Sequence, residues 1–124
     1  MSGFGFIRID HIALAMPPGE EERAREFYRG VLGMRELEKP PELAARGGAW
    51  FQSGGVQIHL GVDKDFRAAK KAHPAIRVSD YDAFVTRMQD ASVPVTPDGV
   101  FVDGAPHCYV DDPFGNRIEF IAPK

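Results

Sequence analysis

The apolar positions of the first half of the chain follow two different periods. Residues 7–16 are rich in β-branched and aliphatic side chains and end at Pro17-Pro18-Gly19, a pattern typical of a strand followed by a turn. A helix is expected next, because apolar side chains then recur at the i, i+3, i+4, i+7 spacing of a buried helical stripe. These positions are Ala24, Phe27, Tyr28 and Val31, and Gly30 and Gly33 are expected to end the helix.

Three short strands complete the first half. They are predicted over residues 34–38, 49–52 and 56–62, with Ser53-Gly54-Gly55 as a tight hairpin between the last two. The order is therefore strand, helix and three strands. Residues 63–71 are polar and basic and have no strand pattern, so they are interpreted as a linker.

The second half repeats this plan. A strand is predicted over residues 73–78 and a helix after Ser79, where Ser79 and Asp82 have the spacing of a capping box. Strands are expected near 93–95, 99–102, 107–110 and 117–121, with the number open by one. The fold class is thus α+β, with one domain (1–124) built from two tandem βαβββ modules, about 1–62 and 72–124, that curve around a cavity.

Composition favours a soluble domain that acts on small molecules. The 124 residues carry a net charge of -3 and are 44% hydrophobic, and Lys and Arg are scattered among acids, so a nucleic-acid partner is not expected. No window is apolar enough to span a membrane, and the first ten residues lack a secretory core, so a cytoplasmic location is expected. The single Cys108 cannot form an internal disulfide and is interpreted as a buried strand residue.

Matching positions of the two halves carry side chains that can bind a metal. His11 and His73 open similar segments 62 residues apart, and His59 and Glu119 lie in similar segments 60 residues apart. Since alternate residues of a strand point to opposite faces, all four are predicted on the face away from the helices. The same face carries small residues that would leave room for a cavity, namely Ala13, Ala15, Gly61 and Ala75.

Three segments give the chain a resemblance to the vicinal-oxygen-chelate superfamily, which includes glyoxalase I, fosfomycin-resistance, bleomycin-resistance and extradiol-dioxygenase proteins. They are Asp10-His11-Ile12-Ala13-Leu14, Phe27-Tyr28 followed by Val31-Leu32-Gly33-Met34, and Asp112-Pro113-Phe114-Gly115-Asn116-Arg117-Ile118-Glu119-Phe120. The resemblance implies a divalent metal, Zn, Ni, Co, Mn or Fe, on the first, fourth, fifth and eighth strands. The matching residues are His11, His59, His73 and Glu119.

The resemblance also implies roles for other residues and a homodimer. Glu119 would be a ligand and a proton shuttle in lyase or isomerase chemistry on a small oxygen-chelating substrate, and Tyr109 would contact that substrate. Arg77 and Arg117 are predicted to hold an anionic substrate because they share the cavity face of their strands. His59 departs from the glyoxalase I pattern, which usually has Glu or Gln there, and the alternative to a ligand is a donor that hydrogen-bonds to one of the ligands. His107 is interpreted as a residue of the cavity rim.

Two questions stay open at this stage. The alternative function is a metal-free binding protein that sequesters an antibiotic, as bleomycin-resistance-like members do, whereas a dioxygenase is disfavoured because such enzymes are typically longer. The sequence also does not decide whether the ligands meet within one chain or across a dimer.

Overall fold

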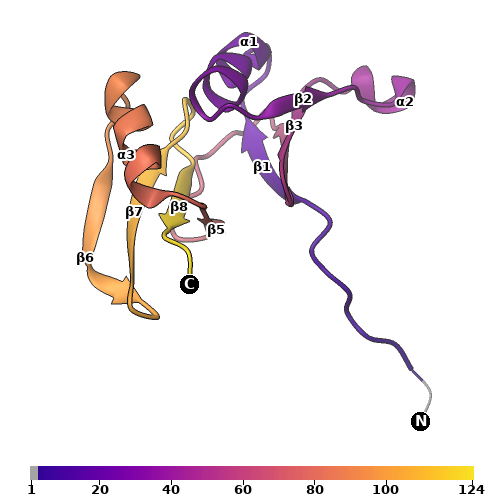
Figure 1. Ribbon diagram of the computed structural model, residues 1–124. Coiled ribbons are helices and arrows are strands. Elements are labelled where there is room, and N and C mark those ends of the chain that lie inside the picture. The colour runs from indigo at the N-terminus through magenta and orange to yellow at the C-terminus, as the bar shows by residue number, and fades with distance from the viewer. Residues whose placement is uncertain (1–2) are drawn as a thin grey trace.

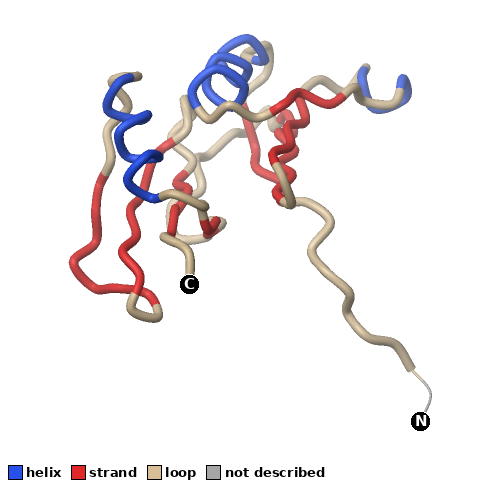
Figure 2. The backbone as a smooth tube through the Cα atoms, viewed as in Figure 1, coloured by secondary structure: helices blue, strands red, loops and turns tan. Residues whose placement is uncertain are grey.

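The computed structural model describes residues 3–124, which form two four-stranded sheets with helices packed against them (Figures 1 and 2). The first half contains β1 (Ile12–Met16), α1 (Glu21–Arg25), η1 (Glu26–Val31), β2 (Arg35–Leu37), α2 (Pro41–Ala44), β3 (Ala49–Ser53) and β4 (Val56–Val62). The second half contains β5 (Ala75–Arg77), α3 (Tyr81–Asp90), β6 (Thr96–Val102), β7 (Ala105–Asp111) and β8 (Arg117–Ile121).

The two sheets have equivalent topologies. Their strand orders are β1-β4-β3-β2 and β5-β8-β7-β6, and in each sheet the first pair is parallel and the other two are antiparallel. This equivalence confirms the tandem βαβββ modules. The sheets remain separate and do not close into one barrel (Figure 1). The connection between β2 and β3 contains the one-turn helix α2.

The first helix buries the predicted stripe. Ala24, Phe27 and Tyr28 are buried, and the Tyr28 ring stacks on Phe51 of β3 with centroids 5.3 Å apart. The helix continues from α1 into the π-helical turn η1 and ends at Val31. Gly33 follows with a φ of 73°, a conformation that costs glycine least, and turns the chain toward β2.

The helix of the second module, α3, is capped one residue later than predicted. Asp80, and not Ser79, accepts the hydrogen bond from the Ala83 amide at 3.0 Å, so the Ser79–Asp82 capping box is wrong. At the other end, Arg87 donates to the carbonyl oxygen of Val31 at 2.6 Å, which ties α3 to the end of the first helix. This contact links the helices of the two modules, whose sheets are separate (Figure 1).

The strands match the prediction closely, with three differences. The strand predicted over residues 7–16 is reduced to β1 (Ile12–Met16), and residues 7–11 lie before it. The segment 93–95 is not a strand, and a single long β6 starts at Thr96, which gives the second module the same strand count as the first. The predicted strand over residues 73–78 is reduced to β5, so His73 and Pro74 lie just before it.

A buried hydrogen-bond cluster joins the modules at the turn before β8. Asn116 is fully buried and donates to the Ala15 carbonyl of β1 at 2.8 Å and to the Asp112 carboxylate at 3.0 Å. Its side-chain oxygen accepts from the Ala69 amide, and the Tyr28 hydroxyl donates to Asp112 at 2.7 Å. Burial, and then the charge of Asp112, raise the pKa of the Tyr28 phenol well above its ordinary value. The Asp-Pro-Phe-Gly-Asn motif thus has a structural role.

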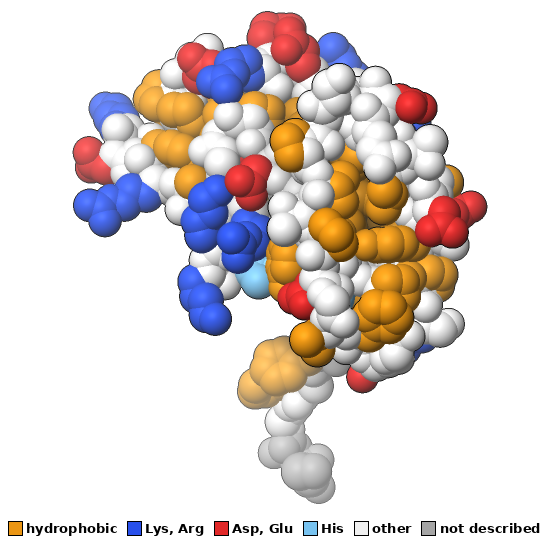
Figure 3. Space-filling view, turned by 90° about the vertical axis from the view of Figure 1, so that its left-hand side faces the viewer, with side chains coloured by type: hydrophobic (Ala, Val, Ile, Leu, Met, Phe, Trp, Pro, Cys, Tyr) orange, Lys and Arg blue, Asp and Glu red, His pale blue; other side chains and the backbone are white. Residues whose placement is uncertain are grey.

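Cys108 is fully buried on β7, as predicted, and burial raises the pKa of its thiol. In contrast, residues 3–11 form an extended arm that leads away from the body and exposes large apolar side chains (Figures 1 and 3). Phe4, Phe6, Ile7 and Ile9 are 77–95% exposed. Within residues 3–124, no helix has the length and apolar character to cross a bilayer.

Candidate functional site

The four predicted metal ligands lie in two pairs, one on each sheet. On the first sheet, Ala13 pairs with His59, and His11 lies two residues before Ala13 on the same face. On the second sheet, Glu119 pairs with Ala75, two residues after His73. Among residues 3–124, no three His, Cys, Asp or Glu side chains form a group that could hold a metal ion. Within the described residues, the four predicted ligands therefore form two separate pairs.

The pair on the second sheet is oriented by hydrogen bonds. The Nδ1 atom of His73 lies 3.0 Å from the Lys71 carbonyl oxygen, which can only accept, so Nδ1 carries the hydrogen and Nε2 keeps a lone pair in the neutral ring. Nε2 lies 3.0 Å from Oε1 of Glu119. Two acceptor atoms at this distance need a proton or a metal ion between them.

His107 holds the other oxygen of the same carboxylate. It is buried, at 5% exposure, and its Nδ1 lies 2.7 Å from Oε2 of Glu119, while its Nε2 donates to the Val100 carbonyl at 2.6 Å. The interpretation of His107 as a rim residue is therefore wrong. The sequence did contain a signal for this position. His107 and Tyr109 are two residues apart on one strand and so point to the same face, and Tyr109 pairs directly with Glu119.

The pair on the first sheet is held in a stack of three rings. The His59 ring lies between His11 and Trp50, with centroids 3.8 and 4.0 Å apart and planes within 13° and 7° of parallel. The lone pairs of parallel rings do not converge on one point, so the stack itself is not a chelating geometry. The sequence interpretation missed Trp50, although it is the cross-strand neighbour of His59.

The two rings differ in the nitrogen atom that remains available. Nδ1 of His11 lies 2.9 Å from an oxygen of Asp10, which leaves Nε2 free to bind, as in carboxylate–histidine–metal arrangements. In His59, Nε2 is already engaged with Gln57 at 2.6 Å. Burial, and then the charge of His11, lower the pKa of His59, so its ring favours the neutral form.

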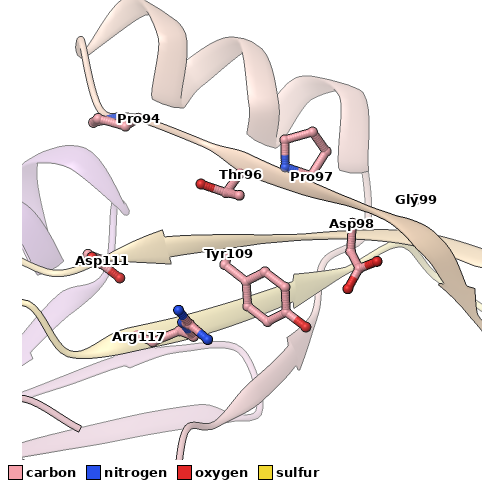
Figure 4. A pocket seen from close by; sticks show the side chains of 8 residues that line it. All are labelled: Pro94, Thr96, Pro97, Asp98, Gly99, Tyr109, Asp111 and Arg117. Carbon is pink, nitrogen blue, oxygen red and sulfur yellow. The ribbon is translucent and has the colours of Figure 1, made fainter. Parts of the chain in front are cut away.

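A cavity of about 470 Å³ lies beside the second-sheet pair, between β6 and the β7–β8 strands (Figure 4). Tyr109 and Arg117, two predicted substrate residues, line it, and the Arg117 guanidinium lies 5.2 Å from the centre of the Tyr109 ring. Burial, and then the charge of Glu119, raise the pKa of the Tyr109 phenol, which keeps it a donor at neutral pH. The rest of the lining includes Thr96, Asp98 and Asp111.

Arg77 lies outside this cavity. Its guanidinium donates to the Ala122 carbonyl at 2.8 Å and lies 3.5 Å from Asp103. The structure therefore brings only one of the two predicted arginines to Tyr109, and Arg77 is occupied by the chain's own C-terminal segment.

Residues 8–120, which contain all four predicted ligands, match the Glyoxalase/Bleomycin resistance protein/Dioxygenase superfamily. The chain belongs to this superfamily. A lactoylglutathione lyase of Haemophilus influenzae is 32% identical over 117 residues, which cover 86% of this chain and 87% of that protein. This superfamily assignment confirms the resemblance that the three sequence motifs predicted.

Two solved structures illustrate the fold within the superfamily. A glyoxalase family protein from Bacillus anthracis is 44% identical, with a TM-score of 0.93 over 100% of both chains. The fosfomycin resistance protein FosX of Listeria monocytogenes is 17% identical, with a TM-score of 0.70 over 100% of this chain and 95% of that chain, and shares the fold.

Proposed function

We propose that this chain is a divalent-metal-dependent enzyme with lyase or isomerase chemistry of the glyoxalase type, acting on a small substrate that offers neighbouring oxygen atoms. The complete centre forms between two copies, with His11 and His59 from one copy and His73 and Glu119 from the other. Membership of the superfamily and the similarity to a protein named lactoylglutathione lyase support the class of reaction.

The observation that carries this proposal is the geometry of His73 and Glu119. Two ligand atoms that bind one ion at about 2.1 Å, roughly at a right angle, lie about 3.0 Å apart. The Nε2 and Oε1 atoms lie at that separation, and each is held by a partner on its far side. Imidazole nitrogen and carboxylate oxygen together suit Zn, Ni, Co, Mn or Fe(II).

The separation of the two pairs, the half-sites of the proposed centre, supports the second copy. In each sheet one predicted ligand lies just before the edge strand, β1 or β5, and the other lies on the neighbouring strand, β4 or β8. Placing β1 of one copy beside β5 of another would bring the two pairs together, and such edges readily pair with another chain. The exposed apolar arm that leads into His11 offers further surface for this contact, since large exposed apolar side chains mark interaction sites.

Each residue then has a chemical role. A bound divalent ion would polarise a substrate carbonyl as a Lewis acid. Arg117 and the Tyr109 hydroxyl orient oxygen atoms of the substrate in the adjoining cavity. For an isomerisation, Oε1 of Glu119 would leave the ion, take up the proton of a hydroxyl-bearing carbon next to the polarised carbonyl and return it to the carbonyl carbon. The hydroxyl proton would pass to the former carbonyl oxygen, so a single carboxylate suffices.

Metal content tests the proposal directly. Protein purified without chelator is expected to carry about one divalent ion per chain, measured by elemental analysis. Two copies would share two equivalent sites, and each copy would contribute half of the ligands to each site. His73→Ala and Glu119→Gln are expected to lose it, whereas Glu42→Gln, on the exposed helix α2, is the matched control and should retain it. Equal metal content in wild type and ligand variants would contradict the proposal and favour the metal-free binding protein.

The fluorescence of Trp50, the only tryptophan of the chain, tests whether His59 is a ligand. For His59 to become the fourth ligand, its ring must leave the stack with His11 and Trp50. Titration with Zn²⁺ is therefore expected to change the Trp50 emission until the sites are full, and His59→Ala should abolish the change. Stoichiometric zinc binding with constant emission would instead make His59 a support of His11 outside the ligand set.

A further inference from the structure

We infer that His107 is a positioning residue that makes Glu119 a one-oxygen ligand, presented through Oε1 only. This inference rests on the proposed metal centre. It assigns a function to a histidine whose position in the sequence predicted only a place on the cavity rim.

Each ring nitrogen of His107 has one close hydrogen-bond partner. The Val100 carbonyl can only accept a hydrogen bond, so the hydrogen on Nε2 is fixed, and the ring cannot rotate without losing this bond. Nδ1 faces Oε2 of Glu119, which also accepts, at 2.7 Å, the distance of a charge-assisted hydrogen bond, so in this arrangement the ring donates from both nitrogen atoms and is positively charged. Asp98, 3.7 Å from Nε2, is the other charged group close to the ring.

The two carboxylate oxygens of Glu119 contact two different histidines. Oε1 faces the lone-pair nitrogen of His73, and Oε2 faces His107. With Oε2 engaged, Glu119 cannot offer both oxygens to one ion, so a coordination position stays open for substrate. Because His107 and Glu119 are 5% and 8% exposed, water competes little for these contacts.

His107 is held in place through strand β6. Val100 belongs to β6, and the same strand contributes Asp98 and Thr96 to the cavity wall. His107 therefore connects the wall of the substrate cavity to the ligand oxygen.

Substitutions that keep one contact at a time test the inference. His107→Asn places an amide near the position of Nδ1 and retains donation to Glu119, whereas His107→Gln reaches toward Val100 and gives up Glu119. The measurements are Co²⁺ affinity and the visible spectrum of the Co²⁺-loaded protein. His107→Ala and His107→Gln should weaken affinity about 10–100-fold and alter the spectrum, as loss of an outer partner of a ligand typically does. His107→Asn should restore both.

The outcomes separate this inference from the proposed function. If the role of His107 were only to anchor β6, His107→Gln would rescue and His107→Asn would fail, which would overturn the inference. Wild-type affinity and spectrum in all three variants would also overturn it, while leaving the metal centre intact. Failure of the wild type itself to bind Co²⁺, in a manner dependent on His73, would overturn both. Urea unfolding of each metal-free variant verifies that it is folded.

Discussion

Replacing Asn116 with alanine is expected to lower the free energy of unfolding by about 3 kcal/mol, since each buried polar group left without a partner costs about 1–3 kcal/mol. The substitution removes a fully buried amide that donates to Ala15 and Asp112 and accepts from Ala69. The Ala15 carbonyl and the Ala69 amide would both lose that side chain as their partner. A loss of this size is a large part of the roughly 5–15 kcal/mol that stabilises a typical domain.

Urea unfolding at a fixed protein concentration measures the effect, with the midpoint lowered and the slope unchanged. Tyr28→Phe removes one hydrogen bond to Asp112 and should cost about 1 kcal/mol. Gln89→Ala, an amide on the exposed face of α3, is the surface control and should change stability by less than about 0.5 kcal/mol. A cost for Asn116→Ala no greater than this control would mean that the cluster does not hold the modules together.

The periodic pattern of the sequence predicted the elements where packing agrees with local preference. The strand 56–62 has the predicted bounds because its alternation and the Gly54-Gly55 turn favour the same register. The Ser79 cap was misassigned because two adjacent residues, Ser79 and Asp80, both have capping side chains. The strand at 93–95 was overpredicted because its valines pack against the core from an irregular segment.

The site was predictable only as far as strand geometry extends. Alternation along a strand fixes the face on which a side chain lies, and this placed His59 and Glu119 correctly on the faces away from the helices. It does not fix how two sheets stand relative to each other, so the division into half-sites required the structure. The contact between His107 and Glu119 was missed for a similar reason. Alternation gave the face on which His107 lies, but it did not identify the residue beside it on the neighbouring strand.

Mixing two inactive variants is expected to restore metal binding if the centre is shared between copies. His11→Ala has a defective first-sheet half-site, and Glu119→Ala has a defective second-sheet half-site. In a mixed pair, the intact first sheet of the Glu119→Ala copy meets the intact second sheet of the His11→Ala copy. The other site of the same pair carries both defects.

The restored fraction follows from counting. If equal amounts exchange freely, half of the pairs are mixed and each has one intact site, so about a quarter of the sites should recover metal. His11→Ala mixed with His59→Ala is the matched control, because both changes lie on the first sheet, and the mixture should gain nothing over its separate components.

The most direct test of the central claim is therefore the zinc content of unfolded and refolded mixtures of His11→Ala and Glu119→Ala, compared with each variant refolded alone. A centre shared between two copies predicts about 0.25 zinc per chain in the mixture and close to none in either variant alone. A mixture that binds no more zinc than its two components, while refolded wild type binds one per chain, would contradict the shared centre.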